Sequence, residues 1–166
     1  GLNPLGGIWA REELINPKVF PPGSTHSTFA SNPLGTAVGL EMFKMTSEVD
    51  YGAMVMAKGK YFLEGLQDLQ KRFPIIGDVD GLGVALRCEI CGPDGFTPDK
   101  ATLDYMVEEG MKGDMLVDGQ KLGLILDVGG YYKNVITLAP SLEISYPEID
   151  LGLKLLEQLL TRAMKR

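Results

Sequence analysis

Residues 21–35 constrain the fold more than any other stretch, because they predict where a long helix begins. The stretch is rich in proline, glycine and hydroxyl side chains, and it leads to the pair Asn32-Pro33. Asparagine is a favoured N-cap, and proline is favoured at the first helical position. Apolar residues then recur at helical spacing as far as Met45. We therefore expect a polar loop followed by a helix over residues 32–47, with a positive helix N-terminus that suits an anion.

The order of residues within this loop is more informative than the helix start, because many capped loops bind nothing. Residues 26–35 read His-Ser-Thr-Phe-Ala-Ser-Asn-Pro-Leu-Gly. They resemble the Gly-Ser-Thr-Phe-Gly-Gly-Asn-Pro-Leu-Ala element of class III aminotransferases, the ornithine and 4-aminobutyrate type of pyridoxal-phosphate enzyme. In that family the threonine hydroxyl binds the phosphate of a cofactor held mainly by the neighbouring subunit. The resemblance implies that Thr28, with Ser27 as a second contact, binds pyridoxal 5'-phosphate across a homodimer.

The first ten residues resemble a different part of the same family. They read Gly-Leu-Asn-Pro-Leu-Gly-Gly-Ile-Trp-Ala, similar to the segment Gly-Gly-x-Pro-Leu-Gly-Ala that follows the Schiff-base lysine. The resemblance implies that this lysine lies before Gly1 and that no catalytic residue is in this chain. The chain is then expected to be the C-terminal portion of a longer enzyme and to be inactive by itself. Residues 6–10 are expected to form a buried strand, and residues 11–14 a short helical turn.

A second motif, residues 134–145, resembles the family strand Asn-x-x-Arg-x-x-Pro-Pro-Leu-x-Ile-Ser. Many members use that arginine to bind a substrate carboxylate through a bidentate pair. The matching position here is Thr137, which is the candidate substrate-binding residue and cannot form such a pair. A simple preference for ornithine-like or 4-aminobutyrate-like substrates is therefore in doubt. Lys133 is a candidate for a substitute cation, and a solvated surface lysine is the alternative reading.

The remaining pattern predicts helices alternating with short strands. A final helix is expected to begin at the capping box of Ser145 and Glu148. The other expected elements are a helix over residues 50–72, a strand pair over residues 75–81 and 82–90, a helix capped by Thr97 and ending near residue 112, strands over residues 115–117 and 122–126, a loop over residues 127–133 and a strand over residues 134–145.

These elements and the resemblance together predict an α/β chain, the C-terminal part of a fold-type I pyridoxal-phosphate transferase. Residues 1–73 are expected to form the end of the large domain and a connecting long helix. Residues 74–166 are expected to form a small α+β domain of two layers. The boundary is placed at Phe73-Pro74, where a helix must end. Without the rest of a large domain, we expect the first part to self-associate or to be disordered near its start.

The composition argues against several kinds of partner. The formal net charge of -6 disfavours nucleic acid and anionic membranes, and no apolar run is long enough to span a bilayer. The motif Cys88-x-x-Cys91 invites a redox or zinc reading, but the only histidine, His26, is distant in sequence, so a structural role is favoured. With no secretory signal and no disulfide framework, a cytoplasmic location is expected.

No metal is expected, although one stretch partly matches a calcium loop. Asp78, Asp80, Gly83 and Glu89 occupy positions one, three, six and twelve of an EF-hand loop. Position five is Leu82, which has no oxygen ligand to offer, and the flanking residues predict strands where an EF-hand has helices. The match is therefore read as coincidental.

The function that the resemblance implies is amino-group transfer between an amine or amino acid and a keto or aldehyde acceptor, with pyridoxal phosphate as cofactor. The expected partners are a second copy of the chain, a small-molecule amino donor and a keto acceptor. Two alternatives stay open. One is a non-catalytic dimerisation or interaction module, and the other is an aminomutase or decarboxylase on the same scaffold, which the missing arginine leaves open.

Overall fold

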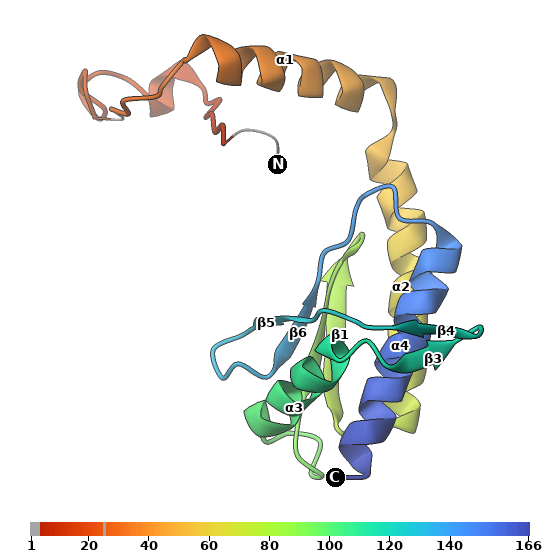
Figure 1. Ribbon diagram of the computed structural model, residues 1–166. Helices are drawn as coiled ribbons and strands as arrows, with labels where there is room; N and C mark the ends of the chain where they lie inside the picture. Colours follow the sequence, from red (N-terminus) through yellow and green to blue (C-terminus); the bar gives the residue numbers. More distant parts are fainter. Residues whose placement is uncertain (1–3, 25) are drawn as a thin grey trace. The chain divides into compact units, whose positions relative to one another are not determined.

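The computed structural model describes residues 4–24 and 26–166, which fall into two structural units, Gly1–Asp50 and Tyr51–Arg166 (Figure 1). The sequence predicted a boundary at residues 73 and 74. In the structure, helix α2 (Tyr51–Arg72) belongs with the second unit, because its Phe62, Leu66 and Leu69 are part of the buried core there. The assignment of residues 1–73 to the large domain of a longer enzyme stays a prediction.

The first unit contains a short 3-10 helix, η1 (Glu12–Leu14), and helix α1 (Pro33–Glu48). The predicted start of α1 is confirmed, since the Asn32 side chain accepts a hydrogen bond of 2.7 Å from the Gly35 N–H. The predicted buried strand over residues 6–10 is wrong. These residues are irregular, and Trp9 is 100% exposed. A strand needs a neighbour to satisfy its backbone groups, and the described residues of this unit contain no other strand.

The first unit has almost no hydrophobic core. Gly35 is the one buried residue among the described residues up to Asp50. The unit instead exposes many large apolar side chains, and they occur before α1 as well as along it. The exposed apolar residues are Leu5, Ile8, Trp9, Leu14, Ile15, Val19, Phe20, Phe29, Leu34, Leu40, Met42, Phe43, Met45 and Val49.

The second unit is built on a four-stranded antiparallel sheet in the order β1-β2-β6-β5. The strands are β1 (Ile76–Leu82), β2 (Ala85–Ile90), β5 (Asp127–Gly129) and β6 (Val135–Leu138). Helices α2, α3 (Lys100–Met111) and α4 (Tyr146–Met164) share one core with its inner face (Figure 1). A separate hairpin, β3 (Met115–Val117) and β4 (Gln120–Leu122), packs on α4 through β3.

The two faces of the sheet differ sharply, which confirms the predicted two-layer α+β fold. Leu86, Cys88 and Ile136 alternate inward and are buried. Arg87 and Thr137 alternate outward and are exposed. Because successive side chains of a strand point to opposite faces, the inner face forms the core and the outer face stays uncovered within this unit.

The two cysteines are free thiols and both are buried. Burial raises the pKa of Cys88 to about 12, and the neighbouring Cys91 and acidic side chains contribute. A thiol that stays protonated at neutral pH is a poor nucleophile and a poor metal ligand. The environment of these residues therefore agrees with the structural role predicted for them.

Helix starts were predicted correctly where no neighbouring side chain competes with the capping residue. At α4, Ser145 and Glu148 form the predicted capping box, with the Glu148 carboxylate accepting from the Ser145 N–H at 2.7 Å. The prediction of Thr97 as the cap of α3 is wrong, because Asp94 accepts a hydrogen bond of 2.9 Å from the Thr97 N–H within the preceding turn. Asp99 caps α3 instead and accepts from the Thr102 N–H at 2.9 Å.

Several strand boundaries also differ from the prediction. Residues 123–126 are irregular because the Leu124 N–H donates to the Gly110 carbonyl of α3, 3.0 Å away, where a strand would use a neighbouring strand. The expected loop over residues 127–133 contains strand β5, which pairs with β6. The expected strand over residues 134–145 is regular only over Val135–Leu138, and Pro140 lacks the N–H that would continue it.

One close approach fixes how α2 packs on the hairpin of β1 and β2. A Cβ atom added at Gly59, in the middle of α2, would overlap the backbone carbonyl of Gly83. Gly83 has a φ of +55°, a left-handed conformation that favours glycine. The helix and the turn therefore touch backbone to backbone, and Val84, beside the turn, is buried.

Candidate cofactor and substrate sites

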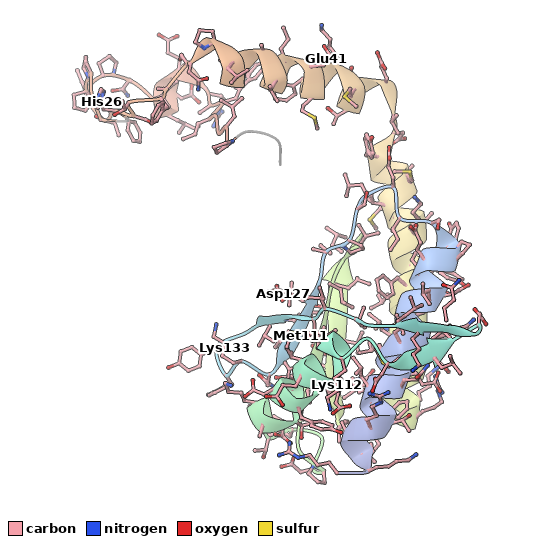
Figure 2. All side chains as sticks on the ribbon, viewed as in Figure 1. His26, Glu41, Met111, Lys112, Asp127 and Lys133 are labelled. Atoms are coloured by element: carbon pink, nitrogen blue, oxygen red, sulfur yellow. The ribbon has the colours of Figure 1, made fainter. Side chains whose placement is uncertain are left out.

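Ser27 and Thr28 lie together in a tight turn shortly before α1. The Ala30 N–H donates to the Ser27 carbonyl at 3.1 Å, and the Asn32 side chain donates to the Phe29 carbonyl at 3.0 Å. Ser27 and Thr28 are exposed, and their hydroxyl groups have no hydrogen-bond partner among the described residues. The turn thus presents two adjacent hydroxyl donors. Figure 2 labels His26, which directly precedes Ser27 in the sequence.

The N-terminus of α1 offers fewer donors than the sequence predicted. Asn32 takes up the Gly35 N–H with its side chain and the Thr36 N–H with its carbonyl. Pro33 has no N–H, so Leu34 is the remaining residue of the first turn whose N–H is not used. Any anion at this loop would therefore be held mainly by the two hydroxyl groups, with the helix dipole as a weaker contribution.

The charge around this turn also suits a phosphate. The sequence from Leu14 to Leu40 contains no aspartate or glutamate, and its basic side chains are Lys18 and His26. Hydroxyl donors without a competing carboxylate are the groups that phosphate oxygens require. The residues present therefore fit the phosphate of a cofactor.

Thr137 lies in the second unit, on the outer face of the sheet, in a row of paired positions that crosses all four strands. The pairing places Asp80 of β1 opposite Arg87 of β2, Arg87 opposite Thr137 of β6, and Thr137 opposite Asp127 of β5. The hydroxyl of Thr137 lies close to Gly129, where an added Cβ atom would be 2.6 Å from its Oγ1. The sequence prediction did not identify this row, because it depends on strand register.

The charges in this row are mainly negative. Arg87 is the cation of the row, and its Nη2 pairs with Asp78 at 3.2 Å and with Asp80 at 3.3 Å. Asp127 adds a further carboxylate beside Thr137. A substrate carboxylate placed at Thr137 would contact a neutral hydroxyl group. On one side of it is Asp127, and on the other is Arg87, which already forms two ion pairs. This surface is therefore a poor carboxylate site.

Lys133, the candidate substitute cation, lies in the loop between β5 and β6 rather than in the row itself (Figure 2). It has a φ of +56° and is exposed. The loop is anchored by Asn134, which is 1% exposed and donates to the Ile90 carbonyl at 2.9 Å. The structure therefore places Lys133 on a solvated loop, as the alternative reading expected.

The part of the chain that the structure describes contains neither a metal-binding cluster nor a membrane-spanning helix. Among its residues, no three histidine, cysteine, aspartate or glutamate side chains gather as a metal site would require. None of the helices found in residues 4–24 and 26–166 is long and apolar enough to cross a membrane. Asp78 and Asp80, two of the residues that match an EF-hand loop, form ion pairs with Arg87.

The fold of the chain matches part of the fold of a known aminotransferase. An aminotransferase from Bacillus anthracis superposes on this chain with a TM-score of 0.71 and 25% sequence identity, covering 83% of this chain and 30% of that one. The chain belongs to the class III aminotransferase family, whose model matches residues 1–160. The family implies pyridoxal 5'-phosphate as the cofactor.

Curated relatives point to the same family. The chain is 29% identical over 158 residues to an acetylornithine aminotransferase of Caldanaerobacter subterraneus, covering 95% of this chain and 35% of the relative. It is 29% identical over 155 residues to the 5-aminovalerate aminotransferase DavT of Pseudomonas putida, covering 93% of this chain and 34% of the relative. The chain thus spans about a third of the length of these relatives.

Proposed function

We propose that the enzyme to which these residues belong transfers an amino group between an amine or amino acid and a keto or aldehyde acceptor, using pyridoxal phosphate. The observation that carries the proposal is the pair of free hydroxyl groups at Ser27 and Thr28, in an acid-free loop of a class III chain. When bound, the cofactor supplies the electron sink for the chemistry. In this proposal the lysine that holds it covalently lies outside the chain.

The part played by this chain is to bind and orient. Thr28 donates its hydroxyl to a cofactor phosphate oxygen, and Ser27 adds a second donor. Two hydrogen bonds to a dianionic group fix its position and therefore the orientation of the attached ring. The outer face of the sheet, with Thr137 and the neighbouring carboxylates, is proposed to border the substrate and to disfavour a carboxylate at that point.

The test is an assay of amino transfer by the enzyme that contains this chain together with its cofactor-binding lysine. Amino donors with and without a carboxylate are screened against pyruvate and 2-oxoglutarate, and both products are measured. We expect equal amounts of new amine and new carbonyl compound, with simple amines among the accepted donors. Carbon dioxide release or isomerisation without an acceptor would indicate a decarboxylase or aminomutase instead. No turnover of any donor would favour the non-catalytic module.

The chain by itself is expected to show neither this activity nor a stable change in the absorbance of added pyridoxal phosphate. Its described residues contribute contacts to one end of the cofactor, and a few hydroxyl donors on an exposed turn cannot offset the loss of translational freedom on binding. A long-lived absorbance change on mixing would contradict this part of the proposal.

We propose that the functional form is a homodimer in which the first unit contacts the second copy. The supporting observation is the large apolar surface of that unit, whose described residues include Gly35 as the one buried residue. The chain is therefore expected to self-associate in a concentration-dependent way. Sedimentation velocity measures this, and Phe43→Ser, which changes an exposed residue of α1 (Pro33–Glu48), should weaken association without unfolding the second unit. A monomer at all concentrations would contradict the expectation.

The reducing cytoplasm remains the proposed location. The observation that supports it is the pair of unpaired thiols at Cys88 and Cys91.

A further inference from the structure

The second unit contains a cavity that begins at the proposed substrate-bordering residues Asp127 and Thr137 and extends beyond them to α4. It has a volume of about 520 Å³ and lies between α4, α2, the ends of β5 and β6 at Asp127 and Leu138, and the irregular segments that adjoin these strands. Its walls are mainly apolar, with Phe62, Leu124, Ile144 and Leu156 among the lining residues. An apolar cavity of this size is large enough to hold a small organic molecule.

Gly152 indicates that the cavity is kept open. It lies inside α4, where glycine destabilises a helix relative to alanine. Other helical glycines of this unit, Gly59, Gly65 and Gly110, have a packing reason, because an added Cβ atom would overlap a neighbouring group. A Cβ atom at Gly152 would meet nothing within 4 Å. Of these four glycines, Gly152 is therefore the one whose added Cβ atom would enter open space. Gly152 is also one of the residues that line the cavity.

Glu148 places a fixed negative charge at the same wall. Glu148, Gly152 and Leu156 are four residues apart and so share one face of α4, and all three line the cavity. The Glu148 Oε2 accepts hydrogen bonds from the N–H and the hydroxyl of Ser145, both at 2.7 Å. Its Oε1 has no partner among the described residues. These hydrogen bonds, and the nearby Lys58, hold the pKa of Glu148 below its usual value.

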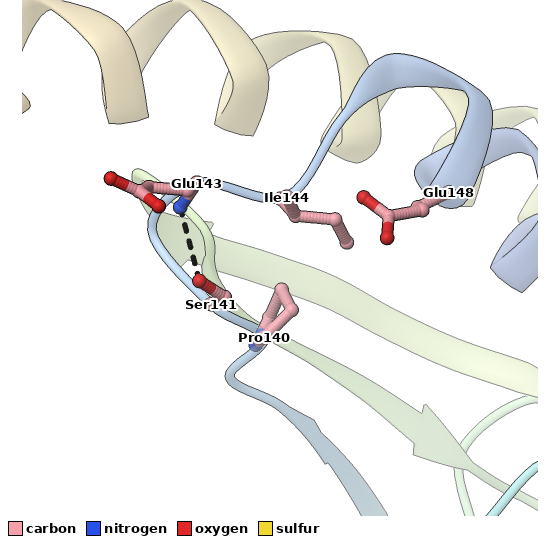
Figure 3. Close-up of a pocket in the computed structure, with 5 residues that line it drawn as sticks. All are labelled: Pro140, Ser141, Glu143, Ile144 and Glu148. Carbon is pink, nitrogen blue, oxygen red and sulfur yellow. Dashed lines mark hydrogen bonds between the residues drawn. The ribbon is translucent and has the colours of Figure 1, made fainter.

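A second, more polar pocket of about 410 Å³ continues from this point. It shares Pro140, Ile144 and Glu148 with the cavity and adds Ser141 and Glu143 (Figure 3). In Figure 3 the Glu148 carboxylate points toward Ile144, whereas the Glu143 carboxylate points away.

The charges around the two pockets are mainly negative. Asp127, Glu143 and Glu148 are among their lining residues, and neither lining includes a lysine or arginine. Two basic side chains lie near their edges. The Lys58 Nζ donates to the Leu142 carbonyl at 3.4 Å, and Arg87, opposite Thr137, already forms ion pairs with Asp78 and Asp80. The charge complementarity therefore favours a cationic ligand.

We propose that this cavity binds an organic cation with an apolar body, of the alkylammonium or arylalkylammonium class. The body lies in the space beside Gly152, and the ammonium group donates a hydrogen bond to the free oxygen of Glu148. The proposal rests on the proposed function at one end of the cavity, where Asp127 and Thr137 are also proposed to border the substrate. Binding of the cation itself requires neither pyridoxal phosphate nor Thr28.

Three probes of equal shape test the proposal on the unmodified chain: 4-phenylbutylammonium, 4-phenylbutan-1-ol and 4-phenylbutyrate. Binding is measured by NMR titration of the chain without cofactor. The amine is expected to bind about tenfold more tightly than the alcohol, since a charge-assisted hydrogen bond replaces a neutral one. The carboxylate is expected not to bind. Equal affinity for amine and alcohol, or no binding of the amine at millimolar concentration, would overturn the proposal.

Two variants locate the ligand. Gly152→Leu fills the open space with a good helix former, and it should weaken amine binding at least about tenfold while the helical circular dichroism is retained. Glu148→Gln keeps a capping box at α4 and removes the charge, so it should bring the amine-to-alcohol affinity ratio close to one. Unchanged affinity in a folded Gly152→Leu variant would show that the cavity is not the site. Because no variant touches Ser27 or Thr28, loss of amine binding and loss of cofactor binding are separate results.

Discussion

Replacing Gly59 with alanine is expected to destabilise the second unit by about 2–3 kcal/mol, although alanine is the better helix former. The added Cβ atom would overlap the backbone carbonyl of Gly83. A backbone group cannot rotate away as a side chain can, so the turn between β1 and β2 must shift. That shift would loosen Val84, which is 4% exposed.

Urea unfolding followed by far-UV circular dichroism measures the effect, and a fall in Tm of roughly 10 °C should accompany it. Gly152→Ala is the matched control, because it makes the same change in helix α4 at a position with open space. It should stabilise the chain by about 0.5–1 kcal/mol. If both alanines stabilise equally, the close contact between Gly59 and Gly83 does not constrain the fold.

Replacing Thr28 with valine is expected to weaken pyridoxal phosphate binding by the enzyme that contains this chain, on the order of 10–100-fold. Valine has nearly the shape of threonine but lacks the hydroxyl, so a charge-assisted hydrogen bond to the phosphate is lost. The loop should keep its shape, because the turn is held by backbone bonds from Ala30 and Asn32 and not by the Thr28 side chain.

An absorbance titration of the cofactor-free enzyme with pyridoxal phosphate gives the two dissociation constants. Thr28→Ser restores the hydroxyl and should recover most of the affinity, which separates hydrogen bonding from packing. Ser27→Ala tests the second donor and should have a smaller effect. If Thr28→Val and Thr28→Ser bind the cofactor equally well, the hydroxyl does not contact the phosphate and the proposed function loses its main support.

The elements that the sequence predicted well are those fixed by neighbouring residues. Asn32-Pro33 and the box of Ser145 and Glu148 each satisfy the first N–H groups of their own helix. Thr97 does not cap α3, because Asp94, three residues earlier, accepts a hydrogen bond from the Thr97 N–H and holds Thr97 in the preceding turn. The competition is visible in the sequence only when both turn geometries are compared.

The features that the sequence could not predict depend on residues far apart in the chain. Leu124 is not in a strand because its N–H bonds to Gly110 at the end of a helix. The acidic surroundings of Thr137 depend on the register of four strands, which brings Arg87 and Asp127 beside it. Motif similarity could identify Thr137 as a substituted position, but only the pairing shows which charges replace the missing arginine.

The exposed Trp9 has a practical consequence for spectroscopy. It is the single tryptophan of the chain, it lies in the first unit and it is fully exposed. All six tyrosines lie between Tyr51 and Tyr146, in the second unit. Indole emission should therefore shift to shorter wavelength when the N-terminal unit becomes covered, and phenol absorbance should follow melting of the sheet. One cuvette can thus monitor two separate events in an unlabelled sample.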